Sequence, residues 1–140
     1  MNKKGFSITE VTIMAVLFIV LLCFAVPKFT HLLHKAQEGS TKHNLMRVRS
    51  ALAVYYGEHQ GMYPTEDLEG SLVPHYLEKM PEALIPGMVP SAQVSTGNFE
   101  QCFTKTGGWA YVSDPNDSRF GEFFVNTDKE DSYGKPWMTH

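Results

Sequence analysis

The chain begins with an apolar run that is long enough to cross a membrane. Uncharged, mostly apolar residues extend from Val11 to Pro27, and the wider segment from Phe6 to Val26 holds 21 residues. As a helix that rises about 1.5 Å per residue, this segment would span about 30 Å, the thickness of the hydrocarbon core of a bilayer. The pattern therefore predicts a membrane-spanning helix over residues 6–27.

Charged residues are almost absent from this segment. Glu10 is the only one between Lys4 and Lys28. An ionised side chain deep in a bilayer costs about 2.5 to 3.5 kcal/mol on insertion scales, so such acids usually have a partner or a function. Because Glu10 lies close to Lys4, it could also extend towards the polar surface of the bilayer. The short basic tail predicts that this end stays in the cytoplasm and that the rest of the chain is exported.

A second helical pattern follows and is amphipathic. Apolar side chains recur at three- and four-residue spacing at Leu45, Val48, Leu52 and Tyr55. This stripe predicts that residues 28–60 continue the helix and bury one face of its later part. Residues 31–43 are more polar on all sides, so we expect them to be exposed. Pro27 has no backbone donor and predicts a bend in the helix, whereas Gly57 and Gly61 predict its end.

Residues 61–140 show short segments separated by proline and glycine. Residues 109–112 and 122–125 are rich in aromatic or β-branched residues and predict two strands, which a loop would join as antiparallel neighbours. Residues 98–104 show an ambiguous strand pattern. The predicted fold class is α+β, with a long N-terminal helix packed on a small head that contains a short antiparallel sheet.

Composition fits a small exported head. Without the apolar segment about 110 residues remain, which is enough for one modest core. Residues 1–49 hold seven Lys/Arg against two acids, and residues 50–140 hold five against thirteen. A head this acidic lacks the basic clusters that neutralise phosphates, so we expect no nucleic-acid partner. The asymmetry would attract staggered neighbouring copies or would simply keep the head soluble.

Three ordinary explanations of the apolar segment remain open on these patterns. A cleaved secretory signal predicts a shorter apolar core and a small-x-small cleavage site, of which Cys23-Phe24-Ala25 is a poor version. A lipoprotein signal would use Cys23, but Leu22 stands where a small residue is expected. A plain single-span anchor explains the length and the lysines and leaves Glu10 without a role.

The residues at the start of the segment form a more specific string. Gly5 is followed by Phe6, Glu10 comes four residues after Phe6, and Pro27 stands 21 residues after Phe6. This string resembles the class III leader of type IV prepilins and type II secretion pseudopilins. The resemblance implies that residues 1–5 are a leader, that prepilin peptidase cuts after Gly5, and that Phe6 is N-methylated. It also implies that Glu10 meets the Phe6 amine of a neighbouring copy, which would pair two buried charges.

The function implied by this resemblance is that of a structural filament subunit. Such a subunit resides in the bacterial inner membrane with its N-terminus cytoplasmic and its head periplasmic. Inner-membrane assembly machinery then polymerises it, with copies of itself and related pilins, into an extracellular pilus or a periplasmic pseudopilus. The alternative is a membrane-anchored or minor-pilin binding module whose exported head binds a ligand or a secreted protein.

Shorter strings in the head also resemble pilins and pseudopilins. They are Tyr63-Pro64-Thr65, Gly107-Gly108-Trp109 and Gly134-Lys135-Pro136-Trp137. Many pilins close a C-terminal loop with a disulfide, but here Cys23 lies in the membrane segment and Cys102 in the head, so we expect no internal bridge. We expect Cys102 to be a small buried residue.

The resemblance to major pseudopilins implies a calcium site near the C-terminus. Weak candidate ligands are Asp114, Asp117, Asp128 and Asp131. The spacing lacks the glycine and glutamate of an EF-hand loop, and solvated acidic loops are the alternative.

The sequence contains no motif that indicates catalysis. His31 and His34 share a helix face, but no third zinc ligand lies nearby in the sequence. The sequence also lacks a phosphate-binding glycine loop, a CxxC pair and a nucleophile motif. We therefore expect no enzymatic activity.

Overall fold

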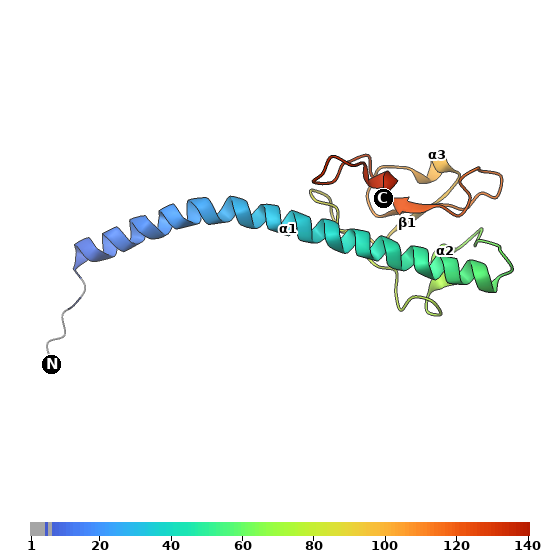
Figure 1. Cartoon of the computed structure of the whole chain (residues 1–140), viewed down its shortest axis with the longest axis horizontal. Coiled ribbons are helices and arrows are strands. Elements are labelled where there is room, and N and C mark those ends of the chain that lie inside the picture. The colour runs from blue at the N-terminus through green and yellow to red at the C-terminus, as the bar shows by residue number, and fades with distance from the viewer. Residues whose placement is uncertain (1–4, 6) are drawn as a thin grey trace. The chain divides into compact units, whose positions relative to one another are not determined.

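The computed structural model describes Gly5 and residues 7–140. Figure 1 shows the order of its elements. They are α1 (Ile8–Glu58), α2 (Leu68–Leu72), β1 (Val94–Gly97), α3 (Phe99–Cys102), β2 (Trp109–Val112), β3 (Phe123–Val125) and the 3-10 helix η1 (Trp137–Thr139). The chain forms two compact units, divided between Lys35 and Ala36.

The first unit contains the N-terminal part of α1, and its large apolar side chains are exposed. From Ile8 to Leu33 these side chains are 46 % to 86 % exposed. By length and composition, α1 holds a candidate membrane span near the N-terminus. The prediction of a long apolar N-terminal helix is therefore confirmed. Pro27 lies inside α1, and its bend stays a prediction.

The second unit packs the rest of α1 on a small sheet. Leu45, Val48 and Leu52 are no more than 4 % exposed and belong to one apolar cluster with Trp109 and Phe123. Because these residues recur at three- and four-residue spacing, they lie on one face of α1, and this face packs on the sheet. The α+β fold class is confirmed, and the buried stripe identifies the face of α1 that the head covers.

The sheet is mixed, and the antiparallel sheet that we predicted accounts for only part of it. β2 and β3 pair antiparallel, with Trp109 opposite Val125, as predicted. β1 adds a third strand that runs parallel to β2, with Val94 opposite Trp109, so the strand order is β1-β2-β3. Nothing in the sequence pattern identified β1, whose residues include Ser95 and Gly97.

The strand predicted over residues 98–104 is wrong, because this segment forms the short helix α3. The Asn98 side chain accepts a hydrogen bond from the Gln101 N–H, and the Gln101 side chain accepts one from the Asn98 N–H. This reciprocal arrangement is a capping box, which satisfies two backbone donors at the start of a helix. The local cap therefore decided the structure of an apolar segment whose periodicity was ambiguous.

Both faces of the central strand β2 are buried. Trp109 and Tyr111 belong to the cluster that α1 covers, whereas Ala110 and Val112 pack with Phe124 and Cys102. Alternate side chains of a strand point to opposite faces, so α1 covers one side of the sheet and α3 the other. Cys102 is fully buried, as predicted, and burial raises the pKa of its thiol to about 11.

Candidate functional site

Glu10 lies in the first turn of α1 and has a partner in its own chain. Its Oε2 atom accepts a hydrogen bond from the Ser7 N–H at 3.0 Å, just before the helix begins at Ile8. A glutamate that reaches back over three residues in this way forms half of a capping box. We missed this contact in the sequence, although the Ser-x-x-Glu spacing at the start of an apolar run is its usual signal.

The cap leaves part of the Glu10 carboxylate available. Within the described part of the chain, Oε1 accepts no hydrogen bond and no cation pairs with the carboxylate. A negative charge in the first turn of a helix also interacts favourably with the helix dipole. Glu10 can therefore cap its own helix and still accept a bond from a cation of another chain.

The other predicted residues of this region are placed only in part. Gly5 is exposed, whereas Phe6 and the leader residues 1–4 lie outside the described residues. At Pro27, whose ring removes a backbone donor, the Thr30 hydroxyl donates to the Pro27 carbonyl at 3.0 Å. The predicted cleavage after Gly5 and the contact between Glu10 and Phe6 remain predictions.

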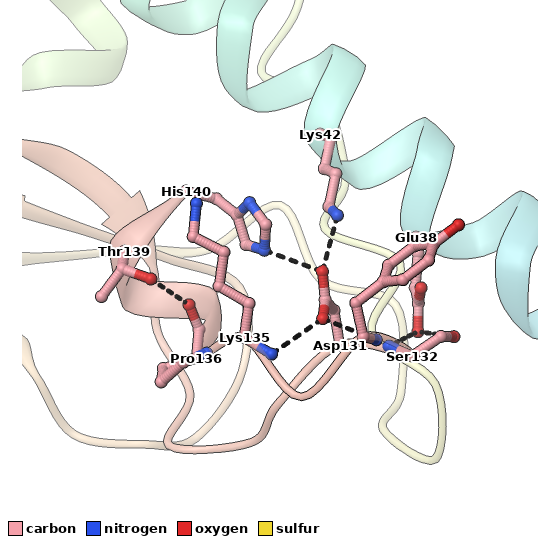
Figure 2. A network of polar contacts seen from close by, with 9 residues as sticks. Glu38, Lys42, Asp131, Ser132, Lys135, Pro136, Thr139 and His140 are labelled. Carbon is pink, nitrogen blue, oxygen red and sulfur yellow. Dashed lines mark hydrogen bonds and ion pairs between the residues drawn. The ribbon is translucent and has the colours of Figure 1, made fainter.

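In the second unit, Asp131 is the centre of a polar cluster that joins the C-terminal loop to α1 (Figure 2). Its side chain is 1 % exposed, and its Oδ2 atom lies 2.7 Å from Lys42 Nζ and 2.9 Å from His140 Nε2. The Tyr133 and Lys135 N–H groups donate to Oδ1 at 2.9 and 3.0 Å. We refer to this cluster of five residues as the C-terminal clamp.

The contacts of the clamp stabilise the ionised form of Asp131. The bond from the Lys42 ammonium holds the pKa of Asp131 far below its usual range, and the two backbone donors act in the same direction. Burial lowers the pKa of His140, which favours a neutral ring that can donate from Nε2. Lys42 therefore acts as the main countercharge of a buried carboxylate.

A second contact ties the same loop to α1 one turn earlier. Glu38 is 6 % exposed and accepts hydrogen bonds from the Ser132 N–H at 2.9 Å and from the Ser132 hydroxyl at 2.7 Å. Thr41 is fully buried and exchanges hydrogen bonds with the backbone of Leu84 at 2.8 Å. The exposure that we predicted throughout residues 31–43 is thus wrong at these positions, because loops distant in sequence cover one face of α1.

The four calcium candidates lie in separate settings. Asp114 accepts a bond from the Asn116 N–H, and Asp117 accepts bonds from the Phe99 and Arg119 N–H groups. Asp128 pairs with Lys105 at 3.4 Å, and Asp131 pairs with Lys42. In the described ranges, no three acids, histidines or cysteines form a set that could hold a metal ion. The cation at the buried aspartate is the Lys42 ammonium.

The overall architecture is pilin-like, with a long apolar N-terminal helix followed by a small mixed-sheet head. No protein-family model, curated protein or solved structure matches the chain.

Proposed function

We propose that this chain is a structural subunit of a type IV pilus-like filament, either a pilin or a type II secretion pseudopilin. Prepilin peptidase would remove residues 1–5, and the mature protein would polymerise through the N-terminal part of α1. The observation that carries the proposal is the exposure of the large apolar side chains from Ile8 to Leu33 in a helix that continues into a folded head.

Apolar surface of this extent requires a partner. Soluble monomers rarely expose large contiguous apolar patches, and such patches mark protein or membrane contacts. A bilayer would cover the helix before assembly, and the helices of other copies would cover it afterwards. Glu10, whose Oε2 atom caps the Ser7 N–H, then lies at the start of this surface, where its remaining oxygen could bind the Phe6 amine of a neighbour.

Membrane topology follows from the same proposal. The basic residues Lys3 and Lys4 would stay in the cytoplasm, and α1 would carry the head across the inner membrane. The partners are then the inner membrane, prepilin peptidase, the assembly machinery and further copies of the chain or related pilins.

Electron microscopy of filaments tests this function. We would shear filaments from cells that express the full chain with an assembly machinery, and label them with antibodies against the head. Labelling along the whole filament is expected of a structural subunit. Retention of all the protein in the membrane without filaments, or labelling restricted to filament tips, would contradict it.

A further inference from the structure

A groove in the second unit lies between α1 and β3, the strand at one edge of the sheet. Its volume is about 500 Å³, and Arg49 and Leu52 of α1, Phe123 of β3 and Met138 of η1 line it. Three of these four side chains are apolar, Arg49 supplies a positive charge, and the polar side chains of Glu122 and His140 also line the groove. The groove therefore suits a ligand that carries a carboxylate on a partly apolar stem.

Arg49 is oriented by one hydrogen bond and has unused donors. Its Nε–H donates to the Phe123 carbonyl at 2.8 Å, which orients the planar guanidinium group. Within the described residues its two terminal nitrogens make no hydrogen bond or ion pair. An arginine fork with free terminal donors matches a carboxylate in geometry and charge.

The charge of Arg49 is also incompletely balanced. Partial burial lowers the pKa of Arg49, and the nearby Glu122 opposes that shift. Glu122 lies 3.9 Å from Arg119, a long contact between two largely exposed side chains, and makes no ion pair with Arg49. An additional carboxylate in the groove would therefore meet a positive charge that no ion pair neutralises among the described residues.

Carboxylates that fit this description lie on the other side of the same head. Glu66 and Glu69 flank Asp67, and all three line a hollow with Val94 and Thr96 of β1. The Asp67 side chain caps α2 through the Gly70 N–H at 3.0 Å. Glu66 and Glu69 are exposed, and neither forms an ion pair in the part of the chain that the structure describes. We call residues 66–69 the acidic turn.

The groove and the acidic turn lie at opposite edges of the sheet. The strand order is β1-β2-β3, with the acidic turn beside β1 and the groove beside β3. A contact between two different patches on identical subunits is heterologous. When its rotation does not close a ring, such a contact generates an open helical filament.

We propose that the Arg49 groove of one copy receives a glutamate side chain from the acidic turn of a second copy. The partner is chosen by charge complementarity, since the head holds thirteen acids against five basic residues over residues 50–140 and its exposed turn carries unpaired carboxylates. This inference rests on the proposed filament function, because it describes a contact between neighbouring subunits of the filament.

Charge reversal tests the contact in full-length protein. Arg49→Glu should lower the yield of sheared filaments about tenfold or more, as expected when one partner of an interface charge pair is lost. Combining it with Glu66→Arg and Glu69→Arg should restore most of that yield. Arg47→Glu is the matched control, because it makes the same change on the same helix outside the groove. A normal yield from Arg49→Glu, or an equal loss from Arg47→Glu, would overturn the proposal.

Folding is separated from assembly by a second variant and a cross-link. Arg49→Gln removes the charge and retains a side-chain donor, and it should lower filament yield while the head stays as protease-resistant as in the wild type.

Cysteines at Ala53, an exposed residue of the groove, and Glu69 should give a ladder of disulfide-linked multimers from oxidised filaments in a Cys23→Ala background. Filaments that yield only monomers would overturn the contact. Absence of filaments from the wild type would instead contradict the proposed function.

Discussion

At the level of single residues, Glu10 has one observed contact within its own chain and one proposed contact with a neighbouring copy. The Ser7 N–H requires only an acceptor oxygen, which Glu10 supplies at 3.0 Å. The proposed contact with the Phe6 amine of a neighbour requires a negative charge. Glutamine keeps the acceptor and loses the charge, so the two roles can be separated.

We expect Glu10→Gln to insert into the membrane normally and to fail in filament assembly. Glu10→Ala should fail in assembly as well, and it should also lose a contribution of about 0.3 to 1.5 kcal/mol to the stability of the helix start. Membrane fractionation and the yield of sheared filaments measure these effects. Wild-type filament yield from Glu10→Gln would show that the charge is not required.

Lys42 is the residue of the C-terminal clamp whose removal should be most harmful. Lys42→Met keeps the length of the apolar stem and removes the main countercharge of the buried Asp131. We expect a loss of about 2 kcal/mol in the free energy of unfolding, less than for a fully buried pair because Lys42 is partly exposed. Thermal unfolding of the full chain in detergent measures the loss. Lys79→Met is the control, since Lys79 is exposed and forms no ion pair among the described residues.

The pH dependence of that loss follows from the lowered pKa of Asp131. Because the folded state depresses this pKa, the contribution of the pair is fully present above the unfolded value of about 3.9. It is lost progressively as the pH falls below that value. The stability difference between the wild type and Lys42→Met should therefore be largest at pH values where His140 is neutral in both proteins, and it should shrink below about pH 4. A difference that stays unchanged at pH 3 would show that the variant acts through packing alone.

At the level of elements, the sequence predicted the helix and strands that are determined by local patterns of apolar residues. The stripe at Leu45, Val48 and Leu52 identified the buried face of α1, and the aromatic and β-branched runs identified β2 and β3. β1 escaped prediction because its four residues have no apolar alternation and depend on pairing with β2. The segment that forms α3 was predicted as an ambiguous strand, because that prediction considered its apolar residues and not the cap formed by Asn98 and Gln101.

The cap of α3 gives an element-scale prediction. Asn98→Ala removes the acceptor for the Gln101 N–H and should destabilise the second unit by about 1 kcal/mol. Glu100→Ala is the matched control, because Glu100 is an exposed residue of the same helix and takes no part in the cap. Thermal unfolding compares the two. Equal melting temperatures for Asn98→Ala and the wild type would show that packing alone holds α3.

For the whole molecule, the general organisation could be predicted and the contacts between distant segments could not. A membrane-length helix that continues into an α+β head follows from residue patterns, and the structure agrees. The C-terminal clamp joins residues 89 positions apart, and the Arg49 groove joins α1 to a strand 74 positions later. Periodicity and spacing contain no signal for such pairs, which is why Lys42, Glu38 and Arg49 were missed.

The proposed function requires that residues 1–5 are a leader whose removal prepares the helix for assembly. The mass of the mature protein, purified from cells that contain prepilin peptidase, tests it most directly. We predict a chain that begins at Phe6 and carries one additional methyl group on its new N-terminus. An intact Met1, or cleavage near Ala25 that removes the apolar helix, would contradict it.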